Sequence, residues 1–98
     1  MMLRISLHPD AERELNDAVD YYAARGQALG RAHSDEFEKS ATQIREFPEA
    51  ASPSRRGTRR KLLHRYPYAI VYWVAPDEIQ VIAFAHMKRS HSFWRGRR

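Results

Sequence analysis

Apolar and polar positions alternate at the start of the chain and then change to helical spacing. Residues 3–7 alternate strictly, which predicts a short strand with one buried face. Over residues 8–25 the apolar positions recur every three or four residues, which predicts an amphipathic helix. Pro9 suits the first turn of this helix, and Gly26 ends it.

A second helix is predicted over residues 29–47, where one apolar stripe ends before Pro48. Two helices joined by a few residues form an antiparallel hairpin. Residues 49–58 contain one proline, one glycine and two serines, and we expect them to form a loop.

Three strands are predicted after this loop, over residues 59–64, 68–74 and 79–85, with a turn at 75–78. The middle strand is almost wholly apolar, which is typical of a central strand covered on both faces. The order predicts one α+β domain spanning residues 1–98. An N-terminal strand and a helical hairpin precede a three-stranded antiparallel meander, with the hairpin packed on one face.

Charge divides the chain more sharply than its formal net charge of +5 suggests. Residues 1–47 contain six Lys or Arg and nine Asp or Glu, whereas residues 48–98 contain eleven and three. This asymmetry favours a surface that docks nucleic acid or an acidic protein, although a soluble basic surface would show it too. The chain has no cysteine, which fits a reducing cytoplasm, and no apolar stretch near the ~20 residues of a membrane span.

Two basic clusters are candidates for binding. The first runs from the loop into the next strand and comprises Arg55, Arg56, Arg59, Arg60, Lys61 and Arg65. Guanidinium groups match phosphates and carboxylates, but charges also protect an edge strand from aggregation. The second cluster follows the last strand and comprises His86, Lys88, Arg89 and His91. His86 alone favours a structural hydrogen bond, and its cationic neighbours favour an anion site.

Aromatic residues offer two further candidates. In the basic tail of residues 88–98, Trp94 stands between arginines and either stacks on bases or packs the tail onto the sheet, and we favour packing. Tyr21 lies beside the apolar stripe of the first helix and, with Tyr22, could form a groove for a partner's helix. The spacing of histidines and glycines predicts neither a metal site nor a cofactor site.

Several motifs together resemble the plasmid-stabilisation toxins of the RelE/ParE superfamily. They span nearly the whole chain: Pro9-x-Ala11-x-x-x-Leu15, Tyr21-Tyr22, Gly57-x-Arg59-Arg60-x-Leu62-Leu63, Tyr66-Pro67-Tyr68-x-Ile70-x-Tyr72, and His86-x-x-Arg89 followed by Trp94-x-x-Arg97. The resemblance implies the architecture predicted above. It also implies one of two activities, which are messenger-RNA cleavage on the ribosome (RelE type) or trapping of DNA gyrase on DNA (ParE type).

Two residues favour the gyrase-directed activity. RelE-type toxins usually carry arginine where Ala69 stands, and they tend to carry a catalytic tyrosine where this chain has Trp94. Alanine cannot hold a phosphate, and an indole neither accepts nor releases a proton near neutral pH. A ribosome-dependent ribonuclease using His86 or His91 as its base remains an alternative, as does a degenerate, non-toxic binding module.

The resulting hypothesis is a non-catalytic cytoplasmic toxin that binds the gyrase–DNA complex and has no membrane partner. The expected target-binding residues are Arg60, His86, Lys88, Arg89, Trp94 and Arg95. A ParD-like, ribbon-helix-helix antitoxin with an acidic binding segment should neutralise the toxin in a hetero-oligomer. The expected antitoxin-binding residues are Tyr21, Tyr22, Arg59, Arg60 and Lys61.

Overall fold

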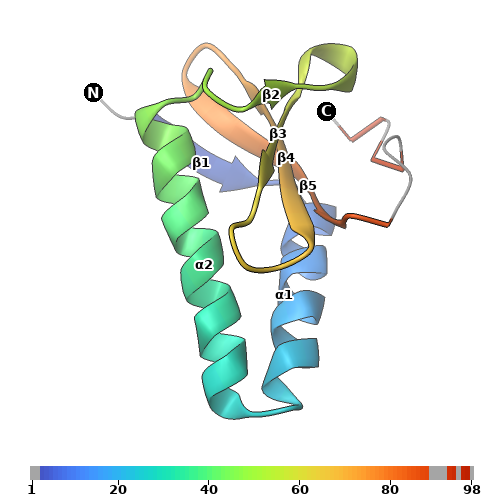
Figure 1. The fold of residues 1–98 in the computed structure, drawn as a ribbon. Helices are drawn as coiled ribbons and strands as arrows, with labels where there is room; N and C mark the ends of the chain where they lie inside the picture. Colours follow the sequence, from blue (N-terminus) through green and yellow to red (C-terminus); the bar gives the residue numbers. More distant parts are fainter. Residues whose placement is uncertain (1–2, 89–92, 95, 98) are drawn as a thin grey trace.

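The computed structural model describes residues 3–88, 93, 94, 96 and 97. One strand and two helices precede the remaining strands, and Figure 1 shows the arrangement. The elements are β1 (Arg4–Leu7), α1 (Pro9–Ala23), α2 (Gln27–Glu46), β2 (Ser52–Pro53), the 3-10 turn η1 (Arg55–Gly57), β3 (Arg59–Leu62), β4 (Tyr68–Val74) and β5 (Glu78–His86). No helix within these described residues is long and apolar enough to cross a membrane.

The sheet contains five strands in the order β1-β5-β4-β3-β2. β3, β4 and β5 form the predicted antiparallel meander. The predicted sheet was incomplete in two respects. β1 pairs with β5 in parallel, with Ile5 opposite Ile79, and the helical hairpin supplies the crossover that parallel pairing requires. In addition, the expected loop over residues 49–58 contains β2, which pairs with β3.

The helical hairpin is tight at its closed end. Gly26 separates the helices with a φ of +156°, where glycine meets no Cβ penalty. A Cβ built on Gly30 would lie 2.7 Å from the Cβ of Ala23, so a larger residue would push the helices apart. At the start of α1, the ring of His8 accepts a hydrogen bond from the backbone N–H of Asp10 at 3.0 Å. This cap fixes where the helix begins.

Both helices cover one face of the sheet, which we call the inner face (Figure 1). The buried cluster there joins helical and strand side chains: Ala11, Ala18, Phe37, Ala41 and Ile44 from the helices, and Ile70, Tyr72, Ile79, Val81 and Phe84 from the sheet. Removing this apolar surface from water is the main contribution to folding.

The opposite, outer face is covered by the C-terminal segment. Trp94 is only 4% exposed and packs with Val71, Ile82 and Ala83. Trp73 and Phe93 lie partly buried around this cluster. The prediction that the central strand is covered on both faces is confirmed, as is the favoured packing role of Trp94.

Candidate functional site

β3 directs its cationic side chains to opposite faces of the sheet, because side chains alternate along a strand. Arg59 lies opposite Tyr72 and donates a hydrogen bond to the carbonyl of Ala51 at 2.8 Å. Lys61 shares this inner side and lines a hollow with Tyr72. These two cations therefore face the end of α2.

Arg60 points the other way. It pairs with Val71, whose side chain belongs to the outer-face cluster. Its Nη2 donates toward the sulfur of Met87 at 3.6 Å. The predicted antitoxin-binding run of Arg59, Arg60 and Lys61 therefore does not form one surface, because the strand places Arg60 on the outer side.

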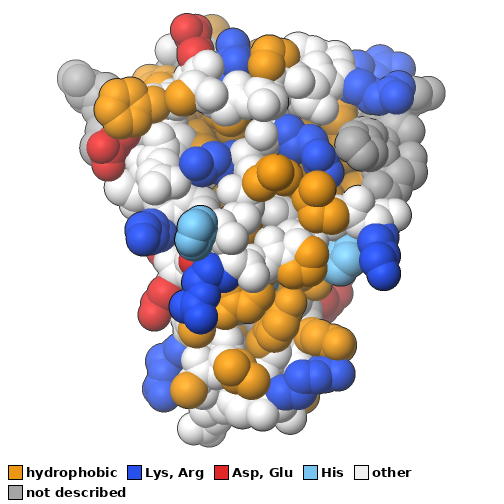
Figure 2. Space-filling view, viewed as in Figure 1, with side chains coloured by type: hydrophobic (Ala, Val, Ile, Leu, Met, Phe, Trp, Pro, Cys, Tyr) orange, Lys and Arg blue, Asp and Glu red, His pale blue; other side chains and the backbone are white. Residues whose placement is uncertain are grey.

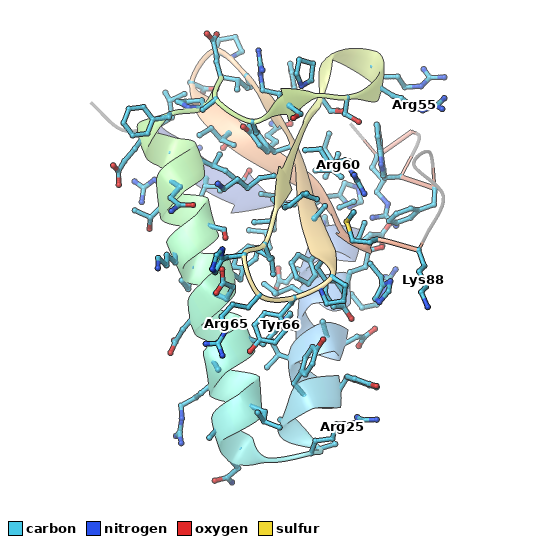
Figure 3. All side chains as sticks on the ribbon, in the orientation of Figure 1. Arg25, Arg55, Arg60, Arg65, Tyr66 and Lys88 are labelled. Carbon is cyan, nitrogen blue, oxygen red and sulfur yellow. The ribbon has the colours of Figure 1, made fainter. Side chains whose placement is uncertain are left out.

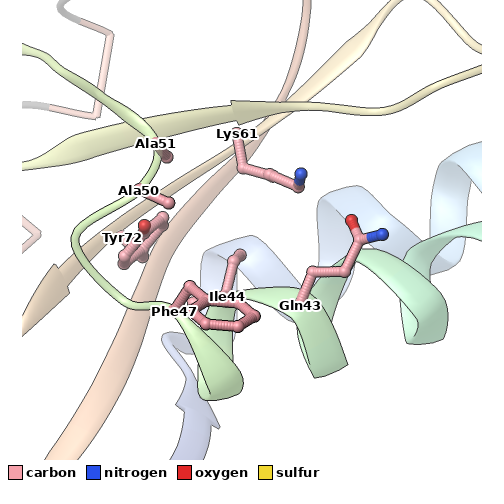
Figure 4. A pocket seen from close by; sticks show the side chains of 7 residues that line it. All are labelled: Gln43, Ile44, Phe47, Ala50, Ala51, Lys61 and Tyr72. Atoms are coloured by element: carbon pink, nitrogen blue, oxygen red, sulfur yellow. The ribbon is translucent and has the colours of Figure 1, made fainter.

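A hollow of about 290 Å³ opens between the end of α2 and β3 (Figure 4). Its floor is fixed by the hydroxyl of Tyr72, which donates to the carbonyl of Pro48 at 2.6 Å. Phe47, predicted as the last residue of a core stripe, is instead 65% exposed. The lining residues are Gln43, Ile44, Phe47, Ala50, Ala51, Lys61 and Tyr72. The hollow is apolar apart from Gln43 and Lys61.

This hollow continues along α2 into a second one. The second hollow shares Gln43 and Lys61 and extends to Leu62 and His64. β2 pairs only with Arg59 and Arg60, so β3 continues beyond it at Lys61 and Leu62. Leu62 is 52% exposed there. We call these two hollows and the adjoining strand edge the α2–β3 groove. The first hollow is mainly apolar, whereas polar side chains, including Glu36 and Lys39, line most of the second. A strand edge beside such a groove can receive a peptide strand or helix.

Sequence reasoning missed the α2–β3 groove, because its walls come from segments far apart in the chain. One available signal was the position of Phe47 directly before Pro48. A helix that stops at this point exposes its final aromatic side chain, since no further turn follows to cover it.

Tyr21 and His86, which were predicted to serve different partners, line one hollow. Tyr21 is 53% exposed, and the guanidinium carbon of Arg25 lies 3.8 Å from its ring centroid. The hollow is lined by Glu14, Asp17, Ala18, Tyr21, Tyr68, Phe84 and His86. The carboxylate of Asp17 makes this hollow less suitable for a phosphate, since like charges repel.

His86 makes structural contacts, as predicted for this residue when it is considered without its cationic neighbours. Its Nδ1 accepts a hydrogen bond from the backbone N–H of Lys88 at 3.1 Å. Its ring meets the ring of Tyr68 edge to face, with centroids 5.2 Å apart. Burial, followed by the neighbouring Tyr22 and Tyr21, raises the pKa of the Tyr68 hydroxyl above its usual range, so this phenol stays protonated near neutral pH.

Tyr22 belongs to a buried aromatic cluster around His33 that sequence reasoning did not identify. The ring of His33 is fully buried and stacks on Tyr22 at a centroid distance of 4.7 Å. Tyr66 and Tyr68 meet it edge to face at 4.5 and 5.3 Å. Among the described residues, neither ring nitrogen of His33 has a hydrogen-bond partner. Burial lowers the pKa of His33, and nearby Glu36 opposes this shift.

A basic edge runs along one side of the molecule. Figure 3 shows Arg55, Arg60 and Lys88 along this side, and we define the basic edge by these three residues. Figure 2 shows Lys and Arg side chains spread over the same view, with apolar side chains between them. Within the described residues, none of the three forms an ion pair with a carboxylate.

The other predicted target-binding residues do not join the basic edge. Trp94 is buried against the outer face, which removes its ring from the surface. His86 faces the inner side, in the hollow with Tyr21. Arg89 and Arg95 lie outside the described residues.

The fold and its exposed surfaces define a small α+β protein with a groove between α2 and β3. In the part of the chain that the structure describes, its basic edge has no carboxylate partner. Residues 5–91 match the ParE toxin of the type II toxin-antitoxin system, parDE. The chain belongs to this toxin family. A search of functionally curated proteins gives no match.

Solved structures show the same architecture. The chain is similar to a structure of the chromosomal ParDE TA system from P. aeruginosa, with a TM-score of 0.75 and 17% sequence identity. The similarity covers 87% of this chain and 96% of the other. At this identity the likeness concerns the fold alone.

Proposed function

We propose that this toxin inhibits DNA gyrase by binding in the cytoplasm, without breaking a covalent bond itself, and thereby blocks replication. The observation that carries the proposal is the basic edge, whose three cations have no carboxylate partner within the described residues. Such cations, which lie in η1, in β3 and just after β5, suit an acidic protein surface or a DNA backbone, both of which a gyrase–DNA complex presents.

The proposed target-binding set differs from the one predicted from sequence. Arg60 and Lys88 remain in it, and Arg55 joins them on the same side (Figure 3). Arg89 and Arg95 stay in the proposal on sequence grounds. Trp94 and His86 are removed, because one is buried and the other lines the acidic hollow of the inner side.

A ribonuclease mechanism finds less support. Cleavage through the 2′-hydroxyl requires a base and a cation at the same phosphate. Lys88 adjoins His86, but His86 shares its hollow with Glu14 and Asp17, and Arg60 lies on the opposite side of the sheet. Ala69, where the RelE type carries arginine, is fully buried.

We further propose that a ParD-like antitoxin occupies the α2–β3 groove with an amphipathic helix or strand. The matched family belongs to parDE systems, and the similar solved structure is of a ParDE system. An acidic segment would meet Lys61 in the groove, while apolar side chains would cover Phe47 and Ile44. Tyr21 of the helical hairpin remains a candidate antitoxin contact, whereas Arg60 does not.

Two assays run side by side test the target. Purified toxin should inhibit gyrase supercoiling and accumulate gyrase cleavage complexes, and a translating extract should show no toxin-dependent cleavage of messenger RNA. Cell killing without any effect on gyrase would defeat the proposal. RNA cleavage that disappears in the H86A/H91A variant would instead establish the ribonuclease, and harmless expression would indicate a non-toxic module.

Substitutions in the groove test the antitoxin surface. Phe47→Ala and Lys61→Glu should each weaken antitoxin binding about tenfold or more, the usual effect of losing a central contact residue. Leu29→Ala is the matched control, because Leu29 is also an exposed apolar residue of α2 but lies outside the groove. In 1 M salt, binding should weaken only partly, since screening does not affect apolar burial. Unchanged binding in both groove variants would rule out this surface.

A further inference from the structure

The C-terminal segment returns to α1, where a largely buried ion pair holds it. Arg97 donates through Nη1 and Nη2 to the two carboxylate oxygens of Glu14, at 2.9 and 3.1 Å. The side chains of Arg97 and Glu14 are only 13% and 11% exposed. A two-point guanidinium–carboxylate pair is directional, so it fixes orientation as well as distance.

Arg97 makes three more contacts from the same position. Its Nη1 donates to the carbonyl of Ile82 at 3.2 Å, and its Nε lies 3.6 Å from a carboxylate oxygen of Asp10. Its guanidinium carbon lies 5.1 Å from the ring centroid of Phe93. One side chain therefore connects the C-terminal segment to both α1 and β5.

Glu14 is itself held in place by the sheet. Its Oε1 accepts a hydrogen bond from the backbone N–H of Phe84 at 3.1 Å. β1 pairs with β5 only as far as Val81, so Phe84 lies beyond the end of β1. The carboxylate satisfies a backbone donor at the edge where β1 has ended, and this contact orients it toward Arg97.

Trp94 covers part of the outer face of the sheet. It packs on Val71, Ile82 and Ala83, which are themselves almost fully buried. Only a short terminal segment makes this contact, so it can open locally while the inner core stays folded.

We propose that Glu14 is a positioning residue that latches the C-terminal segment across the outer face, and that the latched form is the toxic one. This inference rests on the proposed function, because the latch holds the part of the chain that follows β5 and Lys88, and Met87 in the same stretch contacts Arg60. Release of the latch would leave α1, α2 and the sheet intact but would disorganise the surface next to the basic edge.

Fluorescence of Trp94 tests the latch directly. In a Trp73→Phe background, Trp94 is the only indole in the chain. Glu14→Gln and Arg97→Gln should each increase the open population at least about tenfold, because each removes one charge from the two-bond pair. Acrylamide should then quench Trp94 more strongly. The double variant should add little beyond either single variant, because both remove the same pair.

The control is Glu12→Gln, which removes an exposed carboxylate from the first turn of the same helix. It should leave the quenching of Trp94 unchanged. Circular dichroism should show native helix content in every variant, since the latch lies outside the inner core. Trp94 that stays shielded in both latch variants, or becomes accessible in the control too, would overturn the latch.

Growth inhibition and gyrase supercoiling give the functional readout. The two latch variants should lose toxicity in proportion to the exposure of Trp94, whereas Glu12→Gln should stay toxic. Full toxicity with an accessible Trp94 would overturn the positioning role. A wild-type chain that leaves gyrase unaffected would remove the proposed function instead, and the quenching experiment would still decide the latch.

Discussion

The two faces of the sheet are covered in different ways. Two helices of 15 and 20 residues cover the inner face and bury a continuous apolar core. The outer face is covered by the C-terminal segment, through Trp94 and the ion pair of Arg97 with Glu14. We therefore expect loss of the inner cover to unfold the protein, and we expect the outer cover to open locally.

This difference also separates the proposed partners. The α2–β3 groove opens where the inner cover ends, at Phe47 and Lys61. The basic edge includes Arg60, which turns to the outer side. In this proposal, the antitoxin binds next to the helices that cover the inner face, and the target binds next to the C-terminal segment on the outer face.

The largest expected effect lies in the inner core. Phe84 is 2% exposed and stacks on Tyr68 at a centroid distance of 4.8 Å. Phe84→Ala should lower the free energy of unfolding by about 3–5 kcal/mol, because it leaves a cavity between helices and sheet. Urea unfolding measures this loss, with Leu29→Ala as the exposed control. A loss below about 1 kcal/mol would show that the inner layer is loosely packed.

A smaller loss is expected from the outer face. Trp94→Ala should lower the free energy of unfolding by roughly 1–2 kcal/mol. The substitution leaves no enclosed cavity, because the terminal segment can move away from the sheet. The same urea experiment gives the value. A loss equal to that of Phe84→Ala would abolish the distinction between the two faces.

Acid should destabilise the inner layer through His33. Burial holds its pKa below the unfolded value of 6.5, so the unfolded chain binds a proton more readily. Stability is therefore fully present above pH 6.5 and falls as the pH drops through 6.5 toward the folded pKa. The slope should approach about 1.4 kcal/mol per pH unit for one proton. His33→Phe should flatten this slope, whereas a variant of the exposed His64, such as H64Q, should keep it.

The smallest effect is expected from an ion pair at the surface. Arg4 bonds Glu78 at 3.1 Å, but its side chain is 77% exposed. Arg4→Ala should change the free energy of unfolding by no more than about 0.5 kcal/mol, because water and salt screen such pairs. Thermal unfolding at low and high salt measures the change. A much larger effect would contradict the expectation that the exposed Arg4–Glu78 pair contributes less stability than the largely buried Arg97–Glu14 pair.

Local patterns predicted the helices and the meander, because each element carries its own periodicity. The parallel pairing of β1 with β5 was not predictable in this way, since it depends on where the hairpin returns the chain. β2 was missed for a related reason. Two residues in a segment with Pro53 carry no recognisable strand pattern, and only pairing with β3 creates the strand.

The candidate site was predicted less well than the fold. Arg59, Arg60 and Lys61 were grouped because they are adjacent, although alternation along a strand separates Arg60 from its neighbours. Tyr21 of α1 and His86 of β5 line the same hollow, although they lie far apart in the sequence. The pairing of Glu14 with Arg97 links the acidic and basic halves of the chain, and neither residue's neighbours indicate it.

Separation of the two partner surfaces is tested most directly by the Arg60→Ala/Lys88→Ala variant. Its inhibition of gyrase and its affinity for the antitoxin should be measured on one preparation, with Arg31→Ala as a control that removes an exposed cation elsewhere. The account predicts that gyrase inhibition falls about tenfold or more while antitoxin affinity stays at the wild-type value. Equal loss of both activities, or unchanged gyrase inhibition, would contradict it.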